Sequence, residues 1–205
     1  RGMSQTWTPV QRIVDALEDA FYISFDYVQP TNKHWMLSLD LSASMTWNNV
    51  AGMPITPREA SAAMAMITAR TEPEHFITGF SGSFYESSLR GLDISPKMRL
   101  NDVIKLIEKY PAGGTNLSLP MITATHFKLP VDVFVIYTDN EVNKGSIHPF
   151  QALQQYRDTM GIDAKLIVVG MTATKFTIAN PDDPGMLDVA GFDTAAPGIM
   201  SEFAR

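Results

Sequence analysis

The chain of 205 residues is long enough for one domain with a substantial core. It has no cysteine, which excludes disulfide bonds and thiolate zinc sites. Its formal net charge of −6 and its 16 scattered Lys and Arg residues argue against a surface that neutralises nucleic-acid phosphates, because such surfaces cluster basic side chains.

The first predicted element is a helix near the N-terminus. Thr8-Pro9-Val10-Gln11 has a capping pattern with Pro at the first helical position, and it predicts a helix of about 15 residues. Apolar residues recur on one face of this helix: Val10, Ile13, Val14 and Leu17. The helix either lies across a sheet or joins the chain to an upstream domain. We therefore assign residues 1–30 to the helix and this joint, and residues 31–205 to the main domain.

The next element is an apolar strand, Trp35-Met36-Leu37-Ser38-Leu39, which ends in Asp40-Leu41-Ser42-Ala43-Ser44. Alternation along an extended backbone turns the carboxylate of Asp40 and the hydroxyls of Ser42 and Ser44 toward one side. Oxygen donors of this kind suit a hard divalent cation, Mg²⁺ before Ca²⁺. The alternative is that Asp40 and Ser42 only cap the following turn.

Helices and strands alternate after this loop. A capping box at Thr56-Pro57-Arg58-Glu59 opens a helix that runs to about Thr71. Residues 75–81 alternate as in a strand, and residues 83–89 fit a short antiparallel edge strand in a hairpin. Helical spacing then recurs in Val103, Leu106, Ile107 and Tyr110, and Pro111 ends that helix.

Two further segments place polar groups between predicted elements. In Ala112-Gly113-Gly114-Thr115-Asn116 the glycines allow close approach of the backbone and Thr115 presents a hydroxyl, although an ordinary turn before a helix over residues 117–128 is also possible. The strongly apolar strand over residues 131–137 ends in Thr138-Asp139-Asn140-Glu141. Asp139 is thus a carboxylate at the C-terminal end of a strand, where open α/β sheets place their ligand sites.

The last third of the chain continues the alternation with a helix over residues 150–160 and a strand over residues 164–169. The predicted fold is α/β: a doubly wound, mostly parallel sheet flanked by helices, with one antiparallel edge strand. Residues 176–188 are rich in turn formers and acids, and form either a second cation site or a capped, solvated loop. Residues 199–204 begin a terminal helix.

The Asp-x-Ser-x-Ser loop, followed in order by Thr115 and Asp139, resembles the metal-ion-dependent adhesion site of von Willebrand factor A domains. The resemblance implies that Ser42, Ser44 and Thr115 touch Mg²⁺ (or Mn²⁺ or Ca²⁺), and that Asp40 and Asp139 hold it directly or through water. Neutral hydroxyls leave net positive charge at an open coordination position. An acidic side chain from a protein partner would complete the coordination shell.

Taken whole, the sequence also resembles the C-terminal half of the Ro ribonucleoprotein autoantigen family, including its bacterial members. The segment over residues 181–193 resembles that family more specifically than von Willebrand factor A domains in general. The family joins this domain to a ring of HEAT-like repeats that binds small noncoding Y RNAs and the ends of misfolded RNAs. The repeats are absent from this chain. The resemblance therefore implies a role in noncoding RNA binding and RNA quality control, with little RNA binding by these residues alone.

Enzyme classes fit the sequence less well. Haloacid dehalogenase-like phosphotransferases, which use Mg²⁺ and a strand-terminal Asp, ordinarily carry an acid or Thr where this chain has Ser42, and no catalytic Lys stands clearly in place. The elbow of serine hydrolases is only approached by Gly79-Phe80-Ser81-Gly82. The four histidines are isolated: His34, His75, His126 and His148. We expect no catalysis; a phosphotransferase or hydrolase on the same sheet edge, or a structural domain with a vacant metal site, is the alternative.

The sequence also bears on location. No apolar run approaches the roughly 18 residues that suggest a membrane span. The N-terminus lacks the basic region and apolar run of a signal peptide. Together with the absence of cysteine, these features predict a cytoplasmic protein with no membrane partner.

Overall fold

A computed structural model describes residues 8–82, 87–110, 113–139, 147–172 and 178–205. Its strands are β1 (Trp35–Asp40), β2 (His75–Gly82), β3 (Ser87–Gly91), β4 (Val133–Thr138), β5 (Lys165–Gly170) and β6 (Met186–Ala190). Its helices are α1 (Gln11–Ile23), α2 (Pro57–Thr71), α3 (Leu100–Ile107), α4 (Leu119–Phe127), α5 (Pro149–Met160) and α6 (Ala196–Ala204), with a short 3₁₀ turn, η1 (Ala43–Thr46).

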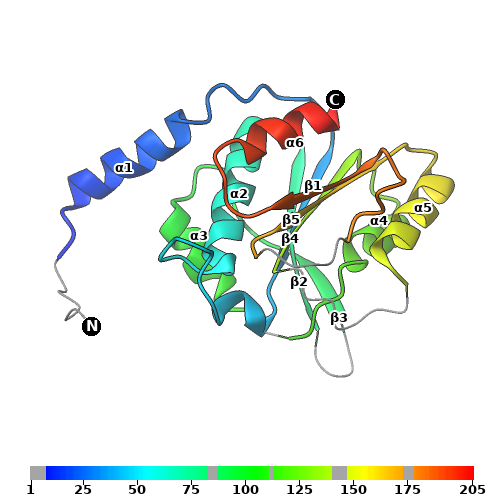
Figure 1. Cartoon of the computed structure of the whole chain (residues 1–205), viewed down its shortest axis with the longest axis horizontal. Helices are drawn as coiled ribbons and strands as arrows, with labels where there is room; N and C mark the ends of the chain where they lie inside the picture. The colour runs from blue at the N-terminus through cyan, green and yellow to red at the C-terminus, as the bar shows by residue number, and fades with distance from the viewer. Residues whose placement is uncertain (1–7, 83–86, 111–112, 140–146, 173–177) are drawn as a thin grey trace.

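The strands form one six-stranded sheet in the order β3-β2-β1-β4-β5-β6. All neighbouring strands are parallel except β2 and β3, which are antiparallel. Helices cover both faces of the sheet (Figure 1). The predicted doubly wound α/β fold is therefore confirmed, and so is its antiparallel edge strand. This strand, β3, extends to Gly91 instead of residue 89, and the predicted residues 83–86 lie outside the described residues.

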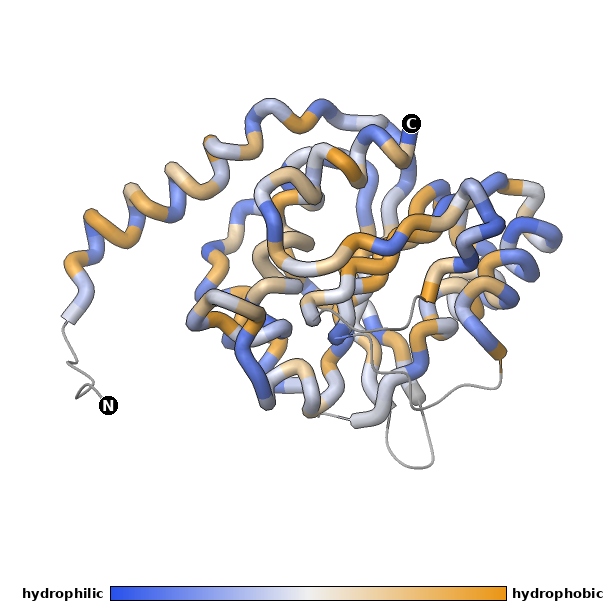
Figure 2. The backbone as a smooth tube through the Cα atoms, viewed as in Figure 1, coloured by the Kyte–Doolittle hydropathy of each residue, from blue (hydrophilic) through white to orange (hydrophobic). Residues whose placement is uncertain are grey.

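Side-chain alternation along the central strands divides the core between the two faces of the sheet. In β4, Val133, Val135 and Tyr137 pack on one face and Phe134 and Ile136 on the other. The first face is covered by α2, α3 and α6, and the second by α4 and α5. Apolar residues accordingly concentrate in the sheet (Figure 2). Because β1 and β4 are buried on both faces, all their residues are buried.

Helix α1 differs from its prediction in two respects. The helix begins at Gln11, and Val10 is its N-cap with an extended backbone conformation. Pro9 therefore lies before the helix and is not its first residue. The helix also does not lie across the sheet: it projects from the body of the domain (Figure 1) and has no buried residue. The exposed fractions of Ile13 and Leu17 are 53% and 66%, and Val14 is half-buried, so most of the predicted apolar face is exposed within the described part of the chain.

Strand β6 was missed by the sequence prediction, which treated the acidic segment as loop. It pairs in parallel with β5, with Val168 opposite Asp188. Its sequence, Met-Leu-Asp-Val-Ala, is short and interrupted by a carboxylate, so it lacks the continuous apolar character of β1 and β4. An edge strand needs only one buried face, which explains why its pattern is weak.

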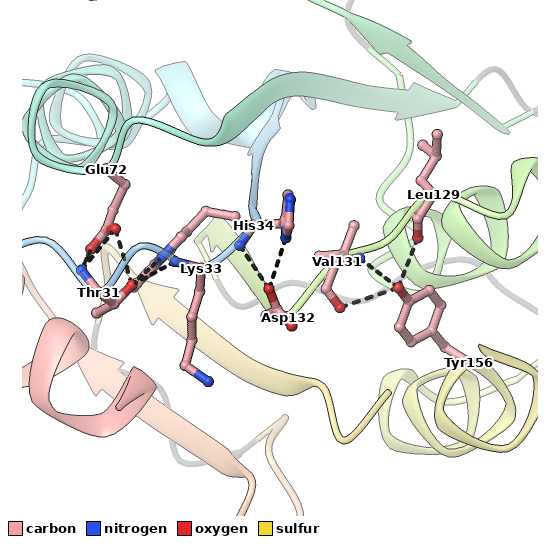
Figure 3. Close-up of polar contacts among 9 residues, drawn as sticks. Thr31, Lys33, His34, Glu72, Leu129, Val131, Asp132 and Tyr156 are labelled. Atoms are coloured by element: carbon pink, nitrogen blue, oxygen red, sulfur yellow. Dashed lines mark hydrogen bonds and ion pairs between the residues drawn. The ribbon is translucent and has the colours of Figure 1, made fainter. Parts of the chain in front are cut away.

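Partly buried polar contacts connect the segments at the edge of the sheet where the parallel strands begin (Figure 3). The backbone N–H and the hydroxyl of Thr31 donate to the buried carboxylate of Glu72 at 2.9 and 3.0 Å. The backbone N–H of His34 donates to Asp132 at 2.8 Å, which ties the start of β1 to the segment before β4. These contacts connect the segments at the N-terminal ends of the strands. The polar loops with the predicted site residues lie at the other, C-terminal edge of the sheet.

Candidate metal centre

Two of the predicted site residues, Asp40 and Asp139, lie at the boundary between β1 and β4, where the chain order switches from one side of the sheet to the other. Strands β1 and β4 are neighbours in space, and the helices that follow them cover opposite faces of the sheet. Ligand sites of open α/β sheets lie in the crevice at such a switch point, beyond the C-terminal ends of the strands. Asp40 is the last residue of β1, and Asp139 directly follows β4. The fold therefore brings both carboxylates to the same edge.

Asp40 is almost completely buried, with an exposed fraction of 1%. Its Oδ1 accepts the backbone N–H of Ser42 at 2.8 Å, and its Oδ2 accepts the hydroxyl of Thr138 at 2.8 Å. Burial raises the pKa of Asp40 to about 7; the hydrogen bonds oppose this rise and the charge of Asp139 adds to it. The two carboxylates are thus close enough to repel each other electrostatically, and Thr138 is a contact that sequence analysis missed.

The two serines lie beside each other in the loop that follows β1. The Oγ atoms of Ser42 and Ser44 are 3.1 Å apart. Ser42 precedes the 3₁₀ turn η1, and Ser44 lies within it. This turn explains how residues two apart bring their hydroxyls together after the strand has ended. Asp40, Ser42 and Ser44 thus lie in one polar segment, in which a 3₁₀ turn, and not the predicted alternation of an extended backbone, positions Ser44.

Thr115 is fully buried in the connection between α3 and α4. Helix α4 precedes β4, which is parallel to β1, so α4 must return toward the N-terminal edge of the sheet. The start of α4, and with it Thr115, therefore lies toward the edge that carries Asp40. Ala112, Asn140 and Glu141, which belong to the predicted loops, lie outside the described residues.

The chemistry of these side chains fits a hard cation better than a soft one. Two buried carboxylates and a pair of adjacent hydroxyls supply only oxygen. Where the structure describes the chain, no three His, Asp or Glu side chains gather closely enough to hold a metal. A cation here would therefore depend on the hydroxyls, and its charge would favour the ionised form of Asp40.

A basic side chain also reaches this loop, and sequence analysis noted it only as part of a capping box. Nη2 of Arg58 donates to the carbonyl oxygens of Leu41 and Ser42, both at 3.1 Å. Arg58 lies in the first turn of α2, the helix that comes after this loop in the chain. No local sequence pattern signals this contact, because it depends on how α2 packs against β1.

The acidic segment after β5 has structural contacts that explain two of its carboxylates. Asp183 accepts two hydrogen bonds from the guanidinium of Arg157, the shorter at 2.6 Å, and one from the N–H of Gly185 at 2.8 Å. Asp188 accepts the N–H of Ala179 at 3.2 Å. These contacts support the prediction of a capped loop rather than a second cation site in the described part of this segment.

Asp183→Asn is expected to lower the free energy of unfolding by about 2 kcal/mol at neutral pH, because it breaks a charge-assisted pair. Burial raises the pKa of Asp183. The hydrogen bonds from Arg157 and Gly185 and the charge of Arg157 together outweigh this effect, so the pKa lies below its ordinary value of 3.8. The stabilisation is therefore present above that value and is lost as the pH falls through the lower, folded-state pKa.

Urea unfolding at neutral pH and below about pH 3 measures this effect. The neighbouring exposed acid provides the control: Asp182→Asn removes the same charge, and among the described residues Asp182 forms no ion pair. If Asp183→Asn cost the same free energy at both pH values, the ionised carboxylate would not be the source of the stabilisation.

Comparisons with known proteins agree on one family. The Ro60 vWA domain family matches residues 34–204. The chain is 49% identical over 201 residues to the RNA-binding protein RO60 of Deinococcus radiodurans, and 42% identical to that of Caenorhabditis elegans. It covers 37% and 30% of these relatives, so it spans less than half of their length.

A solved structure supports the same assignment. The crystal structure of the Deinococcus radiodurans RO (RSR) protein matches with a TM-score of 0.84 and 48% sequence identity, over 98% of this chain and 40% of that one. No helix in the described residues is both long and apolar enough to cross a membrane. On the strength of the family match, the sequence identity and the shared fold, this chain belongs to the Ro60 vWA domain family.

Proposed function

We propose that this chain is the non-catalytic, divalent-metal-binding module of a Ro-type RNA-binding protein, and that it recruits an acidic protein partner through the metal. The observation that carries the proposal is the cluster at the switch point between β1 and β4, where buried Asp40 lies beside Asp139 and the hydroxyls of Ser42 and Ser44 are 3.1 Å apart. Thr115 supplies the third hydroxyl, as the family resemblance implies.

Mg²⁺ is the proposed cation, with Mn²⁺ or Ca²⁺ as substitutes. Mg²⁺ dehydrates reluctantly and is usually held by one or two carboxylates with several waters retained. The cluster offers the same balance of two carboxylates and neutral hydroxyls. A bound cation would supply Lewis acidity toward an anionic ligand at its open position. The residues of this chain would hold and orient the cation. The strands that carry the carboxylates, β1 and β4, are fully buried and would keep water away from that side of the site.

The surroundings of the cluster support a protein partner. Trp47 immediately follows η1, and its backbone N–H donates to the carbonyl oxygen of Ser44 at 3.0 Å. Its side chain has an exposed fraction of 71%, which leaves a large apolar group at the surface within one turn of a proposed metal ligand. Exposed tryptophans often anchor protein interfaces. A partner would thus combine an acidic group for the metal with an apolar surface for Trp47.

Several features favour recruitment over catalysis. His34 directly precedes β1 and His75 begins β2, so both lie at the opposite edge of the sheet. His148 is engaged in capping α5, where it accepts the N–H of Phe150 at 3.4 Å. A Mg²⁺-dependent phosphotransferase or hydrolase would need an acid, base or nucleophile poised beside the metal. A vacant, purely structural site is the second alternative, and a titration with Mn²⁺ distinguishes it.

At the level of the whole protein, RNA binding is assigned to residues outside this chain. The relatives are named RNA-binding proteins, and this chain spans 37% or less of their length. We infer that Y RNA and misfolded RNA bind an upstream region of HEAT-like repeats. Helix α1 and the following segment to residue 30 form the joint to that region. The protein is proposed to work in the cytoplasm.

Proton relaxation of water in the presence of Mn²⁺ tests the metal proposal directly. One Mn²⁺ is expected to bind per chain and to accelerate the relaxation of its remaining waters. Acetate should then reduce this acceleration by roughly a third, since a carboxylate replaces one of about three waters. Acetamide, its neutral counterpart, should not. Absence of Mn²⁺ binding, or equal effects of acetate and acetamide, would contradict the proposal.

Little binding of small RNA is expected for this chain alone. Its net charge is −6 and its 16 Lys and Arg residues are scattered along the sequence, whereas phosphate binding relies on clustered positive charge. Filter binding should give a dissociation constant on the order of 10 μM or weaker, with no preference among small RNAs and a steep loss with salt. Tight binding that resists salt would place an RNA surface within these residues.

A further inference from the structure

The side chain of Arg58 connects α2 to the polar loop after β1. A single nitrogen, Nη2, lies 3.1 Å from the carbonyl oxygens of both Leu41 and Ser42. These carbonyls belong to the two peptide groups on either side of the Cα atom of Ser42, just after the end of β1. Hydrogen bonds from a charged donor are about twice as strong as neutral ones, so the contact restrains this part of the backbone.

The helix that carries Arg58 has a firmly defined start. The N–H of Glu59 donates to the hydroxyl oxygen of Thr56 at 3.3 Å, and the N–H of Thr56 donates to the carboxylate of Glu59 at 2.7 Å. Pro57 occupies the first helical position. This reciprocal capping box fixes the backbone on both sides of Arg58. The backbone of Arg58 is therefore held in place while its guanidinium reaches the loop after β1.

The position of the charge is unfavourable for the helix itself. Arg58 is the second residue of α2, where the helix dipole is positive and acidic side chains are preferred. A cation there costs stability unless another contact compensates for it. The two loop carbonyls accept hydrogen bonds from the guanidinium, and the charges of Asp40 and Glu108 also favour its positive charge. Contacts outside α2 therefore compensate for an arginine at this position.

We propose that Arg58 is a positioning residue of the metal centre, whose guanidinium holds the backbone of residues 40–44 in the conformation that receives the cation. This inference rests on the proposed metal function of Asp40 and the serines. The hydroxyls of Ser42 and Ser44 are then aligned before the metal arrives, and binding does not have to order the loop. Arg58 itself touches no metal. It acts through the backbone carbonyls, and its positive charge also interacts favourably with the carboxylate of Asp40.

Two other roles for Arg58 make different predictions. If its positive charge mainly repelled the cation, its removal would strengthen metal binding. If it served only to attach α2 to β1, its removal would lower stability and leave the metal affinity of the folded protein unchanged. A positioning role predicts weaker metal binding and a less protected loop, even in metal-free protein.

The test compares Arg58→Met, Arg58→Lys and Arg70→Met. Lysine keeps the charge but loses the planar donor geometry. Arg70 lies in the last turn of the same helix, where it donates to the carbonyl of Met98 and stacks on Tyr22, so it controls for general loss of an arginine from α2. Mn²⁺ affinity is measured by the paramagnetic resonance signal of free Mn²⁺, and backbone amide exchange is measured without metal.

Arg58→Met is expected to weaken Mn²⁺ binding about tenfold and to speed amide exchange at residues 42–44, with Arg58→Lys intermediate and Arg70→Met unchanged in both. Unchanged or tighter Mn²⁺ binding by Arg58→Met would overturn the proposal. If that variant does not fold, Arg58→Lys decides: weaker binding supports positioning, and unchanged binding refutes it. Failure of the wild-type chain to bind Mn²⁺ would remove the proposed function as well, whereas normal wild-type binding with an unaffected Arg58→Met removes only this inference.

Discussion

Replacing Asp40 and Ser42 together with alanine is expected to abolish the thermal stabilisation that Mn²⁺ confers on the wild-type chain. A ligand at about 100 times its dissociation constant stabilises the folded state by about 2.7 kcal/mol through mass action. For a domain of this size, that free energy corresponds to a rise of about 5 to 10 °C in the thermal midpoint. The double variant lacks a buried carboxylate and a hydroxyl of the proposed site, so its midpoint should not respond to Mn²⁺.

The matched control for this variant is Ser38→Ala. Ser38 is a fully buried serine within β1, and its hydroxyl lies 2.9 Å from that of Thr78 in the neighbouring strand β2. Its loss should lower the midpoint without metal but preserve the rise with Mn²⁺. Differential scanning calorimetry with and without Mn²⁺ measures both effects. A double variant that still gained about 5 °C or more would show that the cation binds elsewhere.

The second large effect is expected for Tyr156→Ala, which should reduce the free energy of unfolding by about 4 kcal/mol. Tyr156 is fully buried in α5, and its ring meets that of Phe134 edge to face at a centroid distance of 4.9 Å. Its hydroxyl accepts the N–H of Val131 at 2.7 Å and lies 2.8 Å from the carbonyl oxygen of Leu129 (Figure 3). Alanine thus leaves both a cavity and unsatisfied backbone groups.

Tyr156→Phe separates these two contributions. It keeps the ring but leaves the buried N–H of Val131 without its acceptor, so a loss of about 2 kcal/mol is expected. Tyr27→Phe serves as the control, because the hydroxyl of Tyr27 donates to the carbonyl oxygen of Thr194 at an exposed position. Urea unfolding measures all three variants. If Tyr156→Phe were as stable as the wild-type chain, the hydroxyl contacts would contribute nothing to the connection before β4.

The accuracy of the sequence predictions depended on how local the physical cause was. The capping box at Thr56 and Glu59 was predicted and is present, because both partners lie within one turn of the same helix. The strands β1 and β4 were recognisable because burial on both faces demands a continuous apolar run. Strand β6 was missed because an edge strand with one buried face leaves only a faint pattern.

The proposed site shows the same division. The resemblance to von Willebrand factor A domains named five residues as metal ligands: Asp40, Ser42, Ser44, Thr115 and Asp139. It did not reveal the hydrogen bond from Thr138 to Asp40, which arises from the pairing of β1 with β4, or the bonds from Arg58 to the loop. Nor could it show that α1 would leave most of its apolar face exposed, since that depends on what packs against the helix.

By itself, the sequence determined the class of fold, the succession of helices and strands as far as β5, and the polar groups at the strand ends, because hydrophobic periodicity and residue chemistry are properties of neighbouring positions. Only the tertiary structure decided the strand order, and with it the convergence of Asp40 and Asp139 at the β1 and β4 switch point. That convergence, and the burial that raises the pKa of Asp40 to about 7, come from contacts between residues about a hundred positions apart in the chain. No local pattern encodes contacts of that range.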